Sequence, residues 1–402
     1  MPIHFNPFDE AIRCNPYPCY RELQEHDPVH RGLLRAWVVT RHADVAFVLT
    51  DERFCSPKHL ERIADRNRIF KNRGGNLDAL QAASERFYFF LDPPTHTRLR
   101  SLTRTLFSPT AVARMLPIMA SYTDRLLDEL ADRDSFDLID DFAAPLPVFV
   151  IASMLGIQDF DLQKLTAWSF ELSRILDPLV SLRDYQSMDE IVRGFEACFR
   201  EFFAVRRAQP ADDIISVLLA RAQGHDDLQE RDLAAICTML FATGEETTVN
   251  LIGNGMLSLQ RNPGAMARLR KDPDLIGGAV EELLRFESPV QMTTRICTED
   301  LELAGTQIRA GEEVNLVIGA ANRDPAIFAQ PGELRLDRRP NPHLAFGGGI
   351  HFCVGPGLAR AQARVAIPRL LARFPNLRIQ VDNLTWRCNI VVRGLQHLRA
   401  ET

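Results

Sequence analysis

The chain has 402 residues, of which 46% are hydrophobic and 25% charged, and its formal net charge is -6. This composition is typical of a globular protein with a large core, and it lacks the basic excess of a general nucleic-acid binder. We find no uncharged apolar run long enough to span a membrane and no signal peptide at the N-terminus, so we expect a cytoplasmic protein. The eight cysteines form no CxxC pair, which favours reduced thiols, most of them in the core.

Helical patterns dominate the chain. Apolar residues recur at helical spacing in Thr110–Ala131, Asp189–Arg207, Asp212–Ala222, Leu228–Leu259 and Leu275–Phe286. We expect Leu228–Leu259 to be one long helix that stops at Asn262 and Pro263. The polar and basic stretch Pro57–Asn76 ends in two glycines and is interpreted as a loop-rich insertion.

Strand-like segments are few and short. They are Ala36–Thr40, Leu301–Ile308, Glu313–Ile318, Leu377–Val381 and Asn389–Arg393. Their alternation and the turn at Gly311 predict small hairpins. No linker or repeat divides the chain, so we expect one domain over residues 1–402, mainly α with small β-sheets.

Polar residues interrupt the most apolar helical segment at its centre. Leu233–Leu259 is apolar nearly all round, which indicates a buried helix, yet residues 243–248 read TGEETT. These residues could face a wet groove, with their hydroxyls bonding back to helix carbonyls. Alternatively, the helix widens so that a bound molecule and its waters reach Glu246 and Thr247, and Gly244 lets a flat ligand approach the backbone.

One cysteine lies in a glycine-rich stretch, FGGGIHFCVGPGLAR, over residues 346–360. A helical pattern follows it, and a helix N-terminus favours a thiolate through its dipole and free N–H groups. The phosphate-binding patterns GxGxxG after a strand and GxxxxGK followed by Ser or Thr do not fit. A zinc site would need further Cys or His ligands at set spacing, while a purely structural turn remains an alternative.

The string FxxGxHxCxG resembles the haem-binding loop of cytochromes P450. It is carried by Phe346, Gly349, His351, Cys353 and Gly355. Other segments resemble motifs of that family in the same order, namely Asp92–Arg100 (start of the C helix), Thr243–Thr247 (oxygen-activating motif of the I helix), Glu282–Arg285 (ExxR), Ala321–Pro325 and Arg338–His343. The resemblance covers nearly the whole chain and implies the family's triangular helical prism with small sheets.

The resemblance also implies a cofactor and residue roles. Haem b would be bound with Cys353 as the iron ligand. The other haem-binding positions would be His96, Arg100, Gly244, Arg295, Phe346, His351 and Gly355, the two His and two Arg serving the propionates. Glu246 and Thr247 would be the acid–alcohol pair that delivers protons to bound dioxygen. Glu282 and Arg285 would form a structural pair under the cysteine loop.

Three positions depart from the family pattern. Thr243 replaces the usual Ala or Gly, and its hydroxyl is expected to alter the dioxygen pocket. Glu333 replaces an Arg that often completes a triad with the ExxR pair, so we expect Arg335 or His343 as a substitute. Pro368 lies inside the helix after the cysteine loop, where a kink is expected.

The implied function is a monooxygenase that hydroxylates or epoxidises a hydrophobic small molecule in secondary-metabolite biosynthesis, acting as a monomer. Its pocket would draw on Phe90, Leu240, Thr243, Val290, Met292, Ile390 and Val391. Electrons would come from a separate ferredoxin and ferredoxin reductase, with the ferredoxin docking on the cysteine side. Candidate docking cations are Arg104, Arg114, Arg360 and Arg364, for which a solvated role is an equal alternative.

A basic cluster in the 57–90 segment suggests an anionic substrate. It contains Lys58, Arg62, Arg66, Arg68, Lys71 and Arg73. These cations could meet a substrate carboxylate or an acidic carrier protein bearing the substrate, or they could belong to a solvated loop.

Three other activities remain open for a haem-thiolate protein of this kind. They are a peroxide-driven peroxygenase, an oxidative coupling or cyclisation enzyme, and a non-enzymatic haem sensor. The Glu246–Thr247 pair argues against the first, and the polar break in a buried helix argues against the last.

Overall fold

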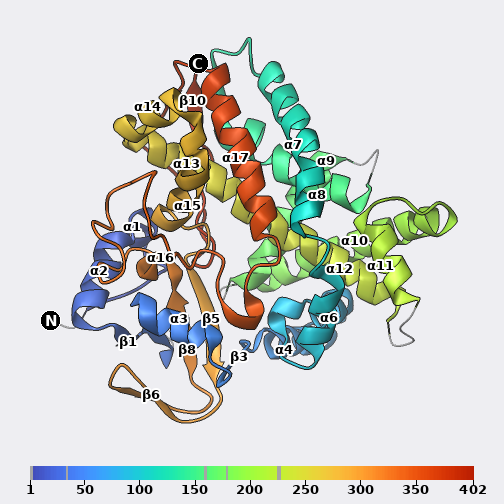
Figure 1. Cartoon of the computed structure of the whole chain (residues 1–402). Helices are drawn as coiled ribbons and strands as arrows, with labels where there is room; N and C mark the ends of the chain where they lie inside the picture. Colours follow the sequence, from blue (N-terminus) through green and yellow to red (C-terminus); the bar gives the residue numbers. More distant parts are fainter. Residues whose placement is uncertain (1–2, 33–34, 158–160, 178–179, 224–227) are drawn as a thin grey trace. The chain divides into compact units, whose positions relative to one another are not determined.

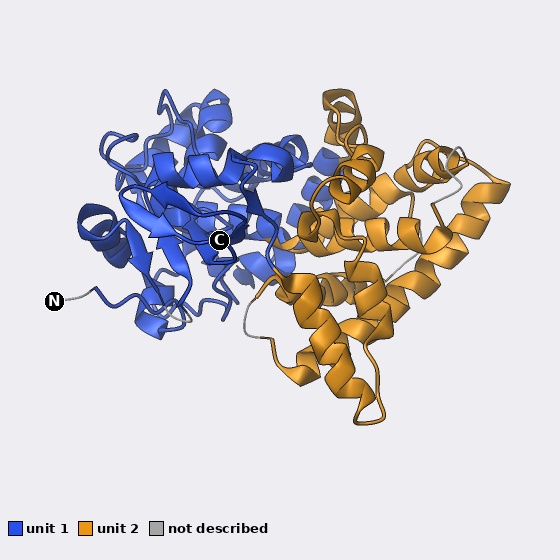
Figure 2. Ribbon diagram, turned by 90° about the horizontal axis from the view of Figure 1, so that it is seen from below, with its two compact units in different colours: residues 1–57, 119–143, 247–402 blue, residues 58–118, 144–246 orange. Residues whose placement is uncertain are grey.

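The computed structural model describes residues 3–32, 35–157, 161–177, 180–223 and 228–402. The chain forms two compact units, coloured separately in Figure 2. Unit 1 contains Met1–Pro57, Met119–Ala143 and Thr247–Thr402, and unit 2 contains Lys58–Ile118 and Ala144–Glu246. Two helices, α7 (Pro109–Glu129) and α13 (Glu246–Arg261), contribute residues to both units. The single domain expected over residues 1–402 stays a prediction.

Unit 1 combines helices with all of the named strands (Figure 1). Its other helices are α1 (Glu10–Cys14), α2 (Tyr17–His26), α3 (His42–Thr50), η3 (Leu138–Ala143), α14 (Pro263–Lys271), η5 (Pro273–Leu275), α15 (Ile276–Phe286), α16 (Ile318–Ala321), η6 (Gly349–His351) and α17 (Pro356–Arg373). Its strands are β1 (Val29–Arg31), β2 (Trp37–Val39), β3 (Phe54–Cys55), β4 (Ser135–Asp137), β5 (Met292–Cys297), β6 (Leu301–Leu303), β7 (Thr306–Ile308), β8 (Glu313–Val317), β9 (Arg378–Ile379) and β10 (Arg399–Glu401).

The main sheet of unit 1 has the strand order β1-β2-β8-β5-β3, with β2 and β8 parallel and the other neighbours antiparallel. Alternate residues of its strands enter two different cores. Val39 and Leu316 join one cluster, and their neighbours Val38 and Val317 join the other. Because side chains alternate along a strand, both faces of this sheet are buried.

Unit 2 is helical. Its elements are α4 (His59–Lys71), α5 (Asp78–Ser84), η2 (Tyr88–Phe90), α6 (Thr95–Thr103), α8 (Pro145–Leu155), α9 (Leu162–Ser173), η4 (Arg174–Leu176), α10 (Leu182–Ala208), α11 (Ile214–Ala222) and α12 (Glu230–Gly244). A stack of rings forms much of its core: Phe195 and Phe199 lie one helical turn apart on α10, and Phe241 of α12 packs on Phe195 with ring centroids 5.6 Å apart.

The fold class predicted from the sequence, mainly α with small sheets, is confirmed. The hairpin expected over residues 301–308 is β6–β7, and the strands expected near residues 36–40 and 313–318 are β2 and β8. The C-terminal segment Leu377–Val381 contains β9. The helices expected at 110–131, 189–207, 212–222 and 275–286 also form, with α10 longer than expected and α17 continuing through Pro368.

The loop expected over Pro57–Asn76 is wrong, because α4 occupies most of it. Asn67 explains why this polar segment is ordered. Its amide nitrogen donates to Asp78 and Gln81 of the next helix, both at 2.8 Å, and its amide oxygen accepts from the N–H of Leu77 at 2.7 Å. The polar contacts therefore hold α4 against α5, a tertiary effect that overrides the loop-like composition.

Two further expectations are corrected. Residues 389–393 form no strand: only an isolated bridge joins Val392 to Val290, because the Asn389 side chain accepts from the N–H groups of Val391 and Val392 and turns the chain. The single helix expected over Leu228–Leu259 is two helices, α12 and α13, separated at Glu245.

One stretch, Leu138–Leu155, is long and apolar enough to cross a membrane by length and composition. It is 72% buried inside the fold, and the core helices of globular proteins pass the same test. We interpret it as part of the core.

Candidate functional site

Cys353 lies in a tightly held loop between η6 and α17, as the glycine-rich string predicted. Its N–H donates to the carbonyl of Phe346 at 2.9 Å, which closes the loop. Gly347 and Gly349 have φ angles of 71° and 61°, in the left-handed region that favours glycine. A Cβ atom on Gly349 would lie 2.4 Å from the carbonyl oxygen of Leu49 in α3, so this turn packs too closely for a side chain.

The donor set around Cys353 fits an iron that takes a single ligand from the protein. The thiol belongs to no disulfide, is partly exposed and lies just before the N-terminus of α17. Among the described residues, the only group of three or more possible metal ligands close to one another is Asp137, Asp140 and His397. Within the described part of the chain, Cys353 thus belongs to no cluster of the kind that binds zinc, whereas a haem iron would need only one thiolate from the protein on this side.

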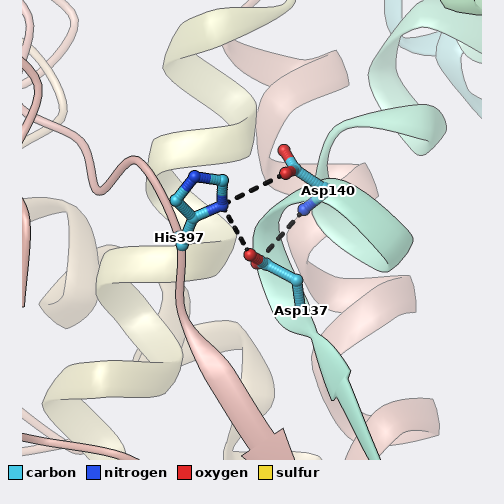
Figure 3. A group of neighbouring side chains, drawn as sticks. All are labelled: Asp137, Asp140 and His397. Carbon is cyan, nitrogen blue, oxygen red and sulfur yellow. Dashed lines mark hydrogen bonds and ion pairs between the residues drawn. The ribbon is translucent and has the colours of Figure 1, made fainter.

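Figure 3 shows that the Asp137, Asp140 and His397 side chains converge near the C-terminal strand. His397 Nδ1 lies 2.8 Å from Asp137 Oδ2 and 3.3 Å from Asp140 Oδ2. The other oxygen of Asp137 accepts from the N–H groups of Ile139 and Leu398 at 2.9 and 3.1 Å. Since these atoms already bond to one another and to the backbone, we interpret the cluster as a structural contact between the chain near β4 and the segment before β10. As a cation site, the cluster is empty.

Two of the four predicted propionate ligands, Arg295 and His351, belong to unit 1. Arg295 lies on β5 with only 7% of its surface exposed, and its Nη1 donates to the carbonyl of Thr294 at 2.8 Å. The Nε2 atom of His351 lies 3.2 Å from the hydroxyl of Ser56. A buried guanidinium and a fixed imidazole are suited to binding carboxylates away from water.

The other two predicted propionate ligands, His96 and Arg100, lie four residues apart on α6, so their side chains share one helix face. His96 is buried, and its ring meets the edge of Tyr88 in η2 at a centroid distance of 6.1 Å. The Arg100 guanidinium lies 5.8 Å from the centre of the same ring. Tyr88 therefore contacts both cations, a role that no linear motif indicated.

The interruption between α12 and α13 lies at the polar centre noted in the sequence. Glu245 leaves the regular helix with φ -97° and ψ -68°, and α13 begins at Glu246. The Thr243 hydroxyl donates to the carbonyl of Met239 at 2.8 Å, the back-bonding considered for these hydroxyls. A Cβ atom on Gly244 would approach Ile151 of α8 to 3.3 Å, so close helix packing also favours glycine there.

Glu246 is held by a residue that the sequence did not point to. The Ser173 hydroxyl, at the end of α9, donates to Glu246 Oε2 at 2.5 Å, and both side chains are buried. The carboxylate thus has a fixed orientation at the first position of α13, where the helix dipole favours a negative charge.

The ExxR pair forms as predicted, but its third member is neither Arg335 nor His343. Arg285 donates to both oxygens of Glu282 at 2.8 Å, and Arg338 Nε reaches the same two oxygens at 3.0 Å. Arg335 contributes only its backbone N–H to Glu282, at 2.9 Å. Arg338 thus fills the place of the missing arginine because its side chain enters the buried site, and the two guanidinium groups compensate the one carboxylate.

Most of the predicted docking cations are already engaged. Arg360 and Arg364 of α17 both bind Glu281, at 2.8 and 3.1 Å. Arg114 pairs with Asp212 at the surface. Of the four candidates, Arg104 at the end of α6 is exposed without an ion pair among the described residues.

The residues predicted to line the substrate pocket belong partly to each unit. In unit 2, Phe90 packs against Phe87 and Phe89, Leu240 is buried on α12, and Thr243 lies one residue before Gly244. In unit 1, Val290 bridges to Val392 next to Val391. Met292 and Ile390 pack into the core cluster around Phe5 and Tyr20 and line a cavity of about 30 Å³, room for about one water molecule. The substrate role of these residues stays a prediction.

Comparison with known proteins identifies the family. The sequence model of the family described as Cytochrome P450 matches residues 53–386. The biotin biosynthesis cytochrome P450 of Bacillus subtilis (strain 168) is 37% identical over 387 residues, covering 96% of this chain and 95% of the relative. The 6-deoxyerythronolide B hydroxylase of Saccharopolyspora erythraea is 36% identical over 402 residues, with 95% of each chain covered.

A solved structure supports the same assignment. P450BioI in complex with hexadec-9Z-enoic acid ligated acyl carrier protein has a TM-score of 0.90 and 36% identity, covering 98% of this chain and 100% of that one. The motif order, the fold and these comparisons agree, and the chain belongs to the cytochrome P450 family, whose members are monooxygenases that hold the iron of haem b through a thiolate.

Proposed function

We propose that this protein inserts one oxygen atom from dioxygen into a hydrophobic small molecule, by hydroxylation or epoxidation, during secondary-metabolite biosynthesis in the cytoplasm. The observation that carries the proposal is the single thiol of Cys353, fixed by a glycine-constrained loop at the start of α17. Bound haem supplies the dioxygen chemistry. The chain's own residues bind that cofactor, position the substrate and move protons.

In this proposal His96, Arg100, Arg295 and His351 bind the two haem propionates. Carboxylates in a poorly solvated site need fixed cations, and charge-assisted bonds are the strongest hydrogen bonds that side chains offer. Phe346, Gly244 and Gly355 contact the ring. The tight packing at Gly349 and the burial of His96 and Arg295 support a preorganised site.

Glu246 and Thr247 handle protons in the proposed reaction. Glu246 accepts a proton from water and passes it on, and the Thr247 hydroxyl, the next group along α13, holds the water that receives it. The interruption at Glu245 and the hydrogen bond from Ser173 support this role, because both fix the carboxylate at a helix start rather than within a regular helix.

Electrons come from a separate ferredoxin and its reductase. The support is a pair of apolar side chains, Ile350 and Phe352, which lie in the cysteine loop just before Cys353 and are 49% and 41% exposed. Adjacent exposed apolar residues are typical of interaction surfaces. Arg104 remains the candidate for an electrostatic contact, since Arg360 and Arg364 already bind Glu281.

The substrate is an apolar molecule that carries an anionic group or is tethered to an acidic carrier protein. A similar structure contains a fatty acid linked to an acyl carrier protein, and a similar enzyme is named for biotin biosynthesis. The basic residues of α4 support an anionic substrate in this chain as well.

The test is turnover of fatty acids, their carrier-protein thioesters and macrolactones with labelled dioxygen, NADPH, ferredoxin and reductase. A product that contains one labelled oxygen atom is expected. Equal turnover with peroxide in place of this system would favour a peroxygenase, and an oxidised product without new oxygen would favour coupling or cyclisation. A spectral shift with substrate but no product under any electron supply would favour a sensor.

Substitution of Cys353 directly tests whether its thiolate is the ligand of the haem iron. Cys353→Ser should abolish the thiolate-type Soret band of the reduced carbon monoxide complex together with turnover. Cys388→Ser is the matched control, because Cys388 is an exposed free cysteine in the same unit. Retention of the thiolate spectrum in Cys353→Ser would overturn the assignment.

A further inference from the structure

Arg62 and Arg66 form an unusual pair on α4. They lie four residues apart, so their side chains share one face of the helix. Both are half-buried, whereas Lys58, Arg68, Lys71 and Arg73 of the same basic cluster are exposed. A half-buried positive charge is more costly than an exposed one unless an anion lies nearby.

Three other cations of this region are paired with acids, whereas Arg62 and Arg66 are not. Lys58 pairs with Glu61, Arg68 with Asp65 and Lys71 with Asp78. Neither Arg62 nor Arg66 forms an ion pair with any described residue. The Arg62 guanidinium contacts the His59 imidazole.

The acids at the start of α10 are also engaged elsewhere. Asp184 binds Arg174 at 2.9 Å, and Asp189 binds Arg193 at 2.8 Å. Between these two acids lies Tyr185, whose hydroxyl is close enough to Arg62 and Arg66 for their charges to lower its pKa, against the larger effect of burial, which raises it. The charges of Arg62 and Arg66 thus reach the Tyr185 hydroxyl, while Asp184 and Asp189 are each paired with another arginine.

Aromatic surface adjoins this cationic group. The His59 ring lies 4.6 Å from the ring of Phe90, which also contacts half-buried Phe89 at 4.3 Å. Burial, and to a smaller extent the charge of Arg62, lowers the pKa of His59 to about 3, so this imidazole is neutral at physiological pH. The neutral ring extends the apolar surface of Phe90 up to Arg62.

We propose that Arg62 and Arg66 bind the free carboxylate of a long-chain acid, whose alkyl chain lies along His59, Phe89 and Phe90. Arginine suits this role because its planar guanidinium group offers paired donors to a carboxylate. The proposal rests on the proposed function, since it names the substrate class of that monooxygenase.

Calorimetric titration of the holoenzyme with dodecanoate and with dodecan-1-ol tests the assignment. The two probes share one alkyl chain and differ in the charged head. A hydrogen bond to a charged group contributes about 1.5–3 kcal/mol, so dodecanoate should bind at least about tenfold tighter than the alcohol. Arg62→Gln and Arg66→Gln should each remove about tenfold from dodecanoate binding and leave dodecan-1-ol binding unchanged.

Arg68→Gln is the matched control, because Arg68 lies on the same helix but is exposed and paired with Asp65. It should bind both probes as the unchanged protein does. Equal affinities for acid and alcohol, or equal losses for both probes in Arg62→Gln and Arg66→Gln, would overturn the proposal. A dodecanoyl thioester of acyl carrier protein that depends on these arginines while free dodecanoate does not would overturn it in favour of a carrier contact.

Failure of the proposed function and failure of the carboxylate site would give different results. Failure of the proposed function would appear as a missing thiolate spectrum or missing oxygen insertion, whatever the calorimetry shows. Failure of the carboxylate site would appear as an absent acid preference in a protein that still shows the thiolate spectrum.

Discussion

Ser173 Oγ donates a hydrogen bond of 2.5 Å to Glu246 Oε2, and it links the end of α9 to the first residue of α13. Ser173→Ala should leave substrate affinity unchanged and lower the amount of product formed per NADPH consumed by about tenfold. The reason is that a lost bond to a charged group costs about 1.5–3 kcal/mol and frees the carboxylate to turn. The ratio of product formed to NADPH consumed measures the effect, and Ser173→Thr, which keeps a hydroxyl, should restore part of it.

Ser169→Ala controls for the loss of a buried hydroxyl in the same helix. Ser169 is also buried on α9, and its hydroxyl has no hydrogen-bond partner among the described residues. Its removal should change neither stability nor coupling. A similar loss of coupling in both variants would mean that Ser173 acts through α9 packing and not through Glu246.

Arg338→Leu should destabilise unit 1 strongly. Arg338 and Arg285 share the fully buried carboxylate of Glu282, and removal of one partner from a buried ion pair costs about 3–5 kcal/mol. Urea unfolding of the holoenzyme, followed by circular dichroism, measures the change in the free energy of unfolding.

Arg335→Leu is the control. It should shift the unfolding free energy by less than about 0.5 kcal/mol, because this exposed residue reaches Glu282 only through its backbone. Equal effects of the two substitutions would contradict the assignment of Arg338 as the third member.

The ion pairs of Glu281 should make stability depend on pH in the acid range. Burial alone would raise the pKa of this carboxyl, but hydrogen bonds and charges from His343 and Arg360 outweigh burial and lower the pKa to about 2. A carboxyl with a lowered folded pKa adds stability that is complete above its ordinary value near 4.5 and is lost as the pH falls toward 2. The gap in urea midpoint between the unchanged protein and Glu281→Gln should therefore be largest near neutral pH and narrow steadily below about pH 4. A gap that stays constant over this range would show that the pairs do not set this pKa.

Linear motifs predicted the parts of the site that are local in sequence. The cysteine loop, the ExxR pair and the polar centre at residues 243–248 each lie within one short segment, so their residue types and spacing could be read directly. The sequence did not predict the partners that folding brings to these residues from distant segments. Ser173 reaches Glu246 from 73 residues away, and Arg338 reaches Glu282 from 56 residues away.

The errors in the predicted elements have a similar cause. A helix over residues 59–71 was missed because its composition is that of a solvated loop, while its stability comes from Asn67 and its bonds to α5. A strand over residues 389–393 was expected from the alternation of its residues, but Asn389 bonds to the following backbone and turns the chain. In both places one asparagine side chain outweighs the general pattern.

Gly349→Ala should impair cofactor binding without a change to any ligand. The residue has φ 61°, where a side chain costs roughly 1–2 kcal/mol, and the added carbon would meet the Leu49 carbonyl oxygen at 2.4 Å. The loop must shift to relieve this contact, and it would carry Cys353 with it. Haem content per chain, measured after purification, should fall well below that of the unchanged protein.

Gly264→Ala in α14 is the control: nothing lies within 4 Å of its added carbon, and loss of a glycine from a helix should stabilise the protein by up to about 1 kcal/mol. Full haem content in Gly349→Ala would mean that the close packing of this loop on α3 does not position the thiolate.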